Sequence, residues 1–184
     1  MTAPVICGGR LRGVRLAVPP GLSTRPTRSR VREALFSIVG QQLPGARVAD
    51  LYAGSGALGL EALSRGAAHV TFVEQDSRAL ACLRRNVQAC RLQPDEYTLL
   101  VTDAQHLLAS AQVFDLVLAD PPFALRDPLP SVLQRPGALA PEGLIVLEQP
   151  GERIAPLQLG ALALRSARPY GTSSLWIYAL SPTR

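Results

Sequence analysis

The sequence predicts an α/β fold with a Rossmann-like, mostly parallel sheet, and three observations support this. From residue 47 onward, short apolar runs alternate with segments of helical periodicity, a pattern typical of parallel strands joined by crossover helices. The first apolar run leads into the glycine-rich turn Gly54-Ser-Gly56, where the missing side chains let the backbone approach a ligand. The end of the chain holds two apolar runs with no helical segment between them, which predicts an antiparallel hairpin.

Each element is predicted from its local pattern. Runs of aliphatic residues bounded by polar or turn residues predict seven strands, at residues 48–52, 70–74, 97–101, 113–119, 144–148, 161–167 and 175–180. Apolar residues at helical spacing, such as Leu80, Leu83 and Val87, predict the connecting helices. These helices are expected at residues 57–65, 77–91, 104–111 and near 128–134.

The first 40 residues are expected to form an extension to this α/β domain. Residues 5–7 and 13–18 predict two short strands with Gly8-Gly9 as turn material, and Val31, Leu35 and Ile38 predict an amphipathic helix. We therefore expect a β-hairpin and a helix over residues 1–40, packed on a main domain over residues 41–184. A chain of 184 residues has room for one well-filled core and little more.

Positive charge is concentrated in this extension. All 19 basic residues are arginine, the net charge is +5, and residues 1–32 contain seven arginines and no acid. A basic arm on a near-neutral body predicts a polyanionic partner, and a solvated arginine face is the alternative. Arg28 and Arg32, four residues apart on one helix face, are expected to point away from the glycine-rich turn. The candidate phosphate-binding residues are Arg10, Arg12, Arg25, Arg28 and Arg32.

The composition argues against several classes of protein. No apolar stretch approaches the roughly 20 residues of a membrane span, and no long apolar block near the N-terminus resembles a signal peptide. The three cysteines lack metal-ligand spacing and the two histidines have no clustered partners, so no metal site is expected. We expect a cytoplasmic, monomeric protein with free thiols.

Acidic residues stand where the predicted parallel strands end, which is the edge where such sheets bind ligands. Asp50 ends the first strand, Glu74 ends the second and Asp103 follows the third. Between the first strand and its helix, backbone amides can face a ligand carboxylate. The alternative for Glu74 and Asp103 is that they are surface acids. The candidate ligand-binding residues are Asp50, Ala53, Gly54, Ser55, Gly56, Glu74, Asp103 and Ala104.

The segment Asp120-Pro-Pro-Phe123 follows the fourth predicted strand at the same sheet edge. The Asp120 carboxylate and the Pro121 carbonyl can each accept one N–H of an aromatic amine, which stabilises the positive charge that develops when the nitrogen is alkylated. Pro121 and Pro122 fix the direction of that carbonyl. Phe123 can stack on the base that carries the amine. Alone, this segment could be an ordinary strand-ending turn.

The glycine-rich turn alone also fits a dinucleotide fold. In this order, the two segments predict an S-adenosylmethionine-dependent enzyme that methylates an exocyclic amine. The turn amides would bind the methionyl carboxylate, and Asp50 the amino group, directly or through water. Glu74 would accept from both ribose hydroxyls, and Asp103 from the adenine amino group beside the Ala104 amide. Direct transfer of this kind needs no metal and no covalent enzyme intermediate.

The chain also resembles the RsmD family, the bacterial 16S ribosomal RNA guanine-N2 methyltransferases, over about residues 5–180. The matching segments are Gly8-Gly9-Arg10, Arg12-Gly13, Arg25-Pro26-Thr27, residues 30–36, residues 54–66, Asp120-Pro-Pro-Phe123 and Tyr170-Gly171. The resemblance implies a class I methyltransferase domain over residues 41–184. It also implies S-adenosylmethionine as donor and a guanine of an assembled or partly assembled small subunit as acceptor. Tyr52 stands where phenylalanine is common in the family, and residues 124–140 match poorly.

Other functions remain open on the sequence. An amino-methyltransferase acting on another RNA, or on an adenine or cytosine amine of DNA, would share Asp120-Pro-Pro-Phe123. The DNA enzyme usually adds a target-recognition region for which this chain has no room. A protein glutamine methyltransferase would favour asparagine at position 120. An inactive RNA-binding module would have no use for an amine-accepting pair such as Asp120 and Pro121. A nicotinamide enzyme would find no hydride-transfer role for this segment.

Overall fold

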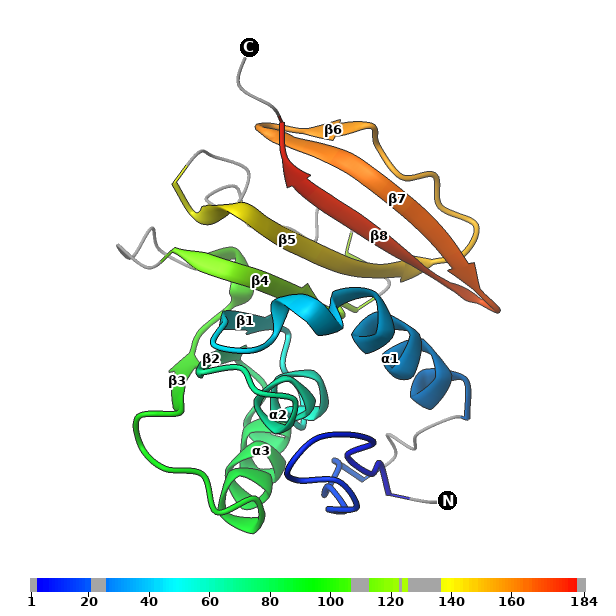
Figure 1. The fold of residues 1–184 in the computed structure, drawn as a ribbon. Helices are drawn as coiled ribbons and strands as arrows, with labels where there is room; N and C mark the ends of the chain where they lie inside the picture. Colours follow the sequence, from blue (N-terminus) through cyan, green and yellow to red (C-terminus); the bar gives the residue numbers. More distant parts are fainter. Residues whose placement is uncertain (1–2, 21–25, 107–112, 123, 126–136, 182–184) are drawn as a thin grey trace.

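The computed structural model describes residues 3–20, 26–106, 113–122, 124–125 and 137–181, with side chains of residues 26–28 and 106 outside the description. Within these residues, one mixed sheet has the strand order β3-β2-β1-β4-β5-β8-β7-β6 (Figure 1). The strands are β1 Arg47–Leu51, β2 His69–Glu74, β3 Tyr97–Val101, β4 Phe114–Ala119, β5 Leu139–Pro150, β6 Gln158–Leu159, β7 Leu162–Tyr170 and β8 Ser173–Leu180.

The sheet has a parallel half and an antiparallel half. β3, β2, β1, β4 and β5 run parallel, and β8, β7 and β6 continue the sheet in antiparallel pairs. The α/β class, the seven predicted strands and the C-terminal hairpin are therefore confirmed. The two-residue strand β6 is an addition that is too short to leave a periodic signal. β5 is longer than predicted because it pairs with β4 from Leu139 and with β8 through Pro150↔Ser173.

The α-helices of the described residues lie where the periodicity predicted them. They are α1 Pro26–Val39, α2 Ala57–Ser64 and α3 Ser77–Ala89, with short 3-10 helices η1 Gly40–Gln42 and η2 Ala104–His106. The carboxylate of Asp76 caps α3 by accepting from the amides of Arg78 and Ala79. η2 lies at the start of the helix predicted at 104–111, of which residues 107–112 are outside the described residues. The helix predicted near 128–134 is outside them as well.

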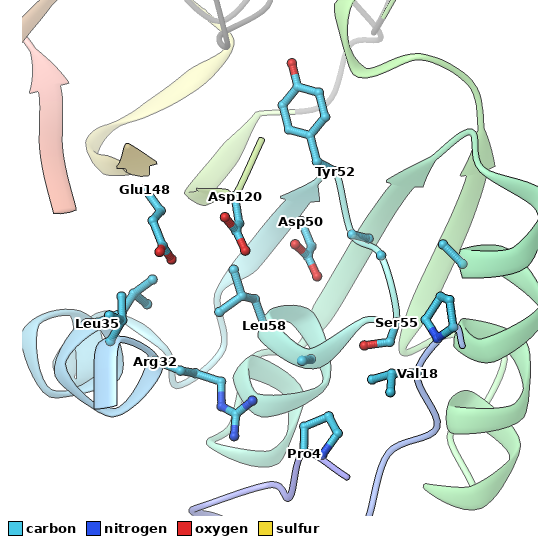
Figure 2. Close-up of a pocket in the computed structure, with 16 residues that line it drawn as sticks. Pro4, Val18, Arg32, Leu35, Asp50, Tyr52, Ser55, Leu58, Asp120 and Glu148 are labelled. Carbon is cyan, nitrogen blue, oxygen red and sulfur yellow. The ribbon is translucent and has the colours of Figure 1, made fainter. Parts of the chain in front are cut away.

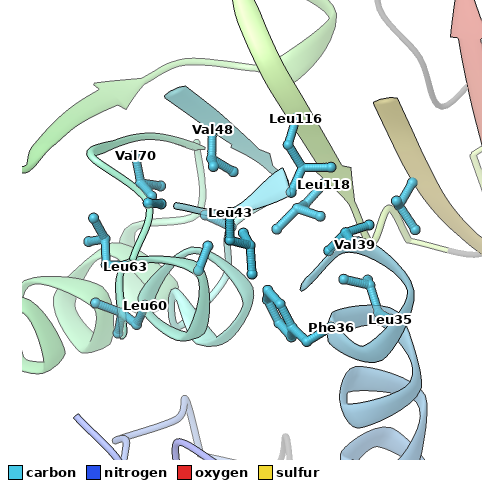
Figure 3. Close-up of a cluster of buried hydrophobic side chains, with 14 of the residues drawn as sticks. Leu35, Phe36, Val39, Leu43, Val48, Leu60, Leu63, Val70, Leu116 and Leu118 are labelled. Carbon is cyan, nitrogen blue, oxygen red and sulfur yellow. The ribbon is translucent and has the colours of Figure 1, made fainter. Parts of the chain in front are cut away.

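All three α-helices contribute to one apolar core against one face of the sheet (Figure 3). Phe36 and Leu35 of α1 and Leu60 and Leu63 of α2 pack with strand residues such as Leu118, all at most 3% exposed. On the opposite face, a second cluster gathers the alternate strand positions. Because Asp50 alternates with the residues of the second cluster, its side chain lies on the face covered by α2.

The N-terminal segment forms a short antiparallel pairing in place of a full hairpin. The bridge joins Val5 and Arg15, and the Ile6 amide donates to the Val14 carbonyl at 3.0 Å. The Leu16 amide donates to the Pro4 carbonyl at 2.8 Å. Ile6 and Leu16 are each 1% exposed and belong to the main core cluster. The extension thus shares the core of the α/β domain.

Buried polar side chains of α2 fix this segment to the domain. Glu61, 1% exposed, accepts from the amides of Cys7 at 2.8 Å and Gly8 at 2.9 Å. Ser64 accepts from the Arg10 amide through its carbonyl and from the Leu11 amide through its hydroxyl, both at 2.8 Å. These bonds satisfy backbone groups that burial would otherwise leave unpaired.

Candidate active site

The glycine-rich turn between β1 and α2 adopts backbone conformations that favour glycine. Gly54 and Gly56 have φ of 57° and 82°. A Cβ at Gly56 would lie 2.4 Å from Leu83 Cδ1, so a side chain there would collide with α3. From the same helix, Asn86 Nδ2 donates to the Ser55 carbonyl at 2.8 Å. The turn is therefore preformed, with its backbone fixed from α3.

Asp50 is buried beneath this turn and holds the start of α2. Its Oδ2 accepts from the Gly59 amide at 2.8 Å, and the residue is 1% exposed. Burial raises the pKa of Asp50 well above its ordinary value; the Gly59 hydrogen bond lowers it, and the charges of Asp120 and Glu74 raise it again. A cation entering here would stabilise the ionised carboxylate.

Glu74, at the end of β2, ties that strand to the turn. Its Oε2 accepts from the Gly54 amide at 2.7 Å, and its Oε1 accepts from the amides of Gln75 and Asp76, both at 2.8 Å. Three backbone donors thus already use much of the carboxylate's acceptor capacity. The contact of Glu74 with two ribose hydroxyls stays a prediction. In this geometry, a second hydroxyl bound to the carboxylate would replace one of its three amide donors.

The end of β3 approaches the same turn. Asp103 Oδ1 accepts from the Gln105 amide at 2.9 Å, and Ala104 is 3% exposed. Gln105 Nε2 in turn donates to the Tyr52 hydroxyl at 2.9 Å. Tyr52 therefore adds a hydrogen bond between the turn and η2 that a phenylalanine at this position could not form.

One pocket brings together carboxylates from three adjacent strands (Figure 2). Asp50 of β1, Asp120 after β4 and Glu148 of β5 all line it. The strand register explains this, because Ala119 pairs with both Leu51 and Leu147 and thereby places Asp120 beside Glu148. Sequence reasoning missed Glu148. Glu148 could have been identified in the same way as Glu74, as an acidic residue at the end of an apolar run.

The predicted residues divide between this pocket and its surroundings. Asp50, Ala53, Gly54, Ser55 and Asp120 line the pocket. Of the remaining predicted cofactor residues, Gly56 packs behind the turn, and Glu74, Asp103 and Ala104 lie at the neighbouring strand ends. Pro121 is buried and Pro122 is exposed, whereas Phe123 is outside the described residues.

Comparison with known proteins assigns the family. Residues 5–179 match the family described as "Conserved hypothetical protein 95". The chain belongs to this family. "Putative rRNA methyltransferase YlbH" of Bacillus subtilis is 33% identical over 178 residues, covering 94% of this chain and 97% of that protein. "Ribosomal RNA small subunit methyltransferase D" of Escherichia coli is 38% identical over 154 residues, covering 82% of this chain and 77% of that protein.

Solved structures of other proteins share the fold. "Putative methyltransferase yhhF from Escherichia coli" superposes with a TM-score of 0.84 at 32% identity, covering 98% of this chain and 99% of that one. A ribosomal protein L11 methylase from Lactobacillus delbrueckii shares the fold with a TM-score of 0.67 at 18% identity, covering 94% and 87% of the two chains. The Rossmann-like methyltransferase architecture expected from the sequence is thus confirmed.

Arg32 corrects one expectation from the sequence. Instead of pointing away from the glycine-rich turn, it lines the same pocket, and the residue is only 7% exposed. Its Nη2 donates to the Val5 carbonyl at 2.7 Å. The pairing of distant segments around α1 buries this side chain, so Arg32 is not a solvated arginine available to an RNA backbone.

The other candidate arginines differ in their surroundings. Arg10 is about half exposed and forms an ion pair with Glu96. Arg12 is exposed on the N-terminal segment. Arg28 lies in α1 with its side chain outside the description, and Arg25 is outside the described residues altogether. The phosphate-binding roles of these four stay predictions.

Two classes of feature are absent from the part of the chain that the structure describes. It contains no group of three His, Cys, Asp or Glu side chains placed to bind a metal ion. Its helices include none long and apolar enough to cross a membrane.

Proposed function

We propose that this chain is an S-adenosylmethionine-dependent methyltransferase that methylates the exocyclic N2 amine of a guanine in small-subunit ribosomal RNA. The observation that carries the proposal is the pocket in which Asp50, Asp120 and Glu148 line one cavity with the glycine-rich turn. The names of the family relatives from Bacillus subtilis and Escherichia coli support ribosomal RNA as the substrate class.

The residues of the pocket fit this methyl donor. Burial raises the pKa of Asp50, so an ammonium group bound beside it would stabilise its ionised form. S-Adenosylmethionine supplies a methyl group on a sulfonium sulfur, next to an ammonium and a carboxylate. Asp50 would hold the ammonium group, and Glu74 and Asp103 would hold the ribose and the adenine.

Asp120 and the Pro121 carbonyl activate the acceptor amine. An exocyclic amine is a weak nucleophile because its lone pair is delocalised into the ring. When Asp120 Oδ and the Pro121 oxygen each accept one N–H, the lone pair is localised on the nitrogen. The Asp120 charge stabilises the nitrogen more strongly as it becomes positive, which is the differential binding that lowers a barrier. Phe123 would hold the base by stacking.

Nucleoside mass spectrometry tests this function. Small subunits and naked 16S RNA from a strain lacking this gene would be incubated with purified protein and S-adenosylmethionine. We expect N2-methylguanosine to appear at one position with wild type and not with Asp120→Ala. A methylated adenine or cytosine amine would contradict the guanine assignment. Binding of RNA with no methylation under any condition would favour an inactive RNA-binding module.

A further inference from the structure

Arg32 carries a positive charge that the described residues only partly neutralise. It reaches from α1 into the wall of the pocket that Gly54 and Ser55 of the glycine-rich turn also line (Figure 2). Its side chain is 8% exposed, and its Nε lies 3.9 Å from Glu61 Oε2, beyond hydrogen-bond distance. That Nε is buried without a hydrogen-bond partner.

Glu61 is the ion-pair partner of Arg32, but its carboxylate also serves several other donors. Its Oε1 accepts from Arg65 Nε at 2.7 Å and from the Gly8 amide at 2.9 Å. Its Oε2 accepts from the Cys7 amide at 2.8 Å. Two guanidinium groups therefore share one carboxylate, and a net positive charge is buried at the pocket wall. Burial of such a charge is costly unless an anion completes the cluster.

The anion must be small enough to enter the pocket. The other charged residues that line the pocket, Asp50, Asp120 and Glu148, are acids and would repel an anion elsewhere in it. The methionine end of S-adenosylmethionine carries an ammonium and a carboxylate on one carbon atom. A pocket with acids on one side and a guanidinium on the other matches this pair of opposite charges.

We propose that Arg32 binds the α-carboxylate of S-adenosylmethionine at the wall of this pocket. The proposal rests on the proposed function and adds a cofactor-binding residue from outside the α/β domain. The Val5 carbonyl, which accepts from Arg32 Nη2, holds the guanidinium in position. The N-terminal extension thereby contributes a cation to the cofactor site.

Binding of two ligands to the purified protein tests the proposal by calorimetry. Decarboxylated S-adenosylmethionine lacks the α-carboxylate and keeps the ammonium and the sulfonium. If net charge alone decided the affinity, the acidic pocket would bind this ligand more tightly than S-adenosylmethionine. We expect wild type to bind S-adenosylmethionine at least about tenfold more tightly, the effect of one charge-assisted hydrogen bond. Equal affinities would overturn this proposal and leave the proposed function intact, whereas no binding of either ligand would overturn both.

Variants assign the discrimination to Arg32. Arg32→Gln should lose most of the preference between the two ligands, and Arg32→Lys should keep part of it. Arg30→Gln is the matched control, because Arg30 is exposed on the same helix. Thermal unfolding of each variant without ligand checks its fold. An equal loss of affinity for both ligands in Arg32→Gln would mean that Arg32 only supports the fold, and this proposal would be wrong.

Discussion

Gly9 offers a sharp test of how the N-terminal extension is attached. Gly9 has a φ of +74°, and a Cβ there would lie 1.7 Å from the Ser64 carbonyl oxygen. Gly13 has a φ of +91° with nothing within 4 Å of its Cβ position. Gly13→Ala therefore imposes a backbone penalty alone, whereas Gly9→Ala adds a collision with α2.

The expected magnitudes follow from these geometries. A non-glycine residue in the left-handed region costs about 1–2 kcal/mol, which is the expectation for Gly13→Ala. To relieve its collision, Gly9→Ala must move away from Ser64 and lose the hydrogen bonds of the Arg10 and Leu11 amides. At about 0.5–1.5 kcal/mol each, these bring the total for Gly9→Ala to about 2–5 kcal/mol.

Urea denaturation of the two variants and wild type measures the free energy of unfolding. We expect Gly9→Ala to lower it more than Gly13→Ala by at least about 1 kcal/mol. Gly9→Ala should also weaken S-adenosylmethionine binding, because Pro4 lines the pocket and the neighbouring Val5 holds Arg32. Equal destabilisation by the two substitutions would refute the reasoning that Gly9 fixes the extension to α2.

Further predictions concern the chemistry and the charges. Asp120→Ala should reduce turnover by about a hundredfold or more, with S-adenosylmethionine affinity within a few-fold by calorimetry, since its main partner is the target amine. Glu74→Ala should weaken that affinity, because the ribose loses its acceptor and the turn loses a tie to β2. The pKa of Asp50 is raised, so the folded state binds more protons than the unfolded state as pH rises above the ordinary carboxyl pKa. The free energy of unfolding, measured in urea, should therefore fall as pH rises through the raised pKa, and Asp50→Asn should remove this dependence. Neutralising Arg12 and Arg28 together should reduce the slope of log affinity for small-subunit RNA against log salt by roughly 1.4–1.8, and an unchanged slope would leave them as a solvated face.

Most of the sheet and the central turn could be predicted because their signals are local. An aliphatic run followed by Gly54-Ser-Gly56 identifies a strand, a turn and a helix without reference to the rest of the chain. The acids at the strand ends were found in the same way, and Asp50 and Asp120 do line one pocket. Glu148 could have been found by the same rule, but its position beside Asp120 depends on the pairing of β4 with β5.

Arg32 could not be placed from sequence because its burial depends on two segments that are distant from it in the chain. Helical periodicity puts it on a face with Arg28, which suggests solvent exposure. The Val5 carbonyl and the Glu61 carboxylate, 27 and 29 positions away, come together only when the N-terminal segment docks on α2. A count of arginines therefore overstates the charge that this extension can offer to a polyanion.

Asn86 joins the N-terminal extension and the glycine-rich turn into one structural unit. This side chain is 1% exposed; its Oδ1 accepts from the Ala17 amide at 2.7 Å, and its Nδ2 donates to the carbonyls of Ala17 at 2.9 Å and Ser55 at 2.8 Å. A buried amide that is fully hydrogen-bonded is rigid, because any displacement leaves polar groups unpaired. Displacement of Ala17 would therefore also displace Ser55, which lies in the wall of the pocket. Together with Arg32, this contact means that the described part of the N-terminal extension belongs to the wall of the candidate active site rather than forming a separate basic segment beside it.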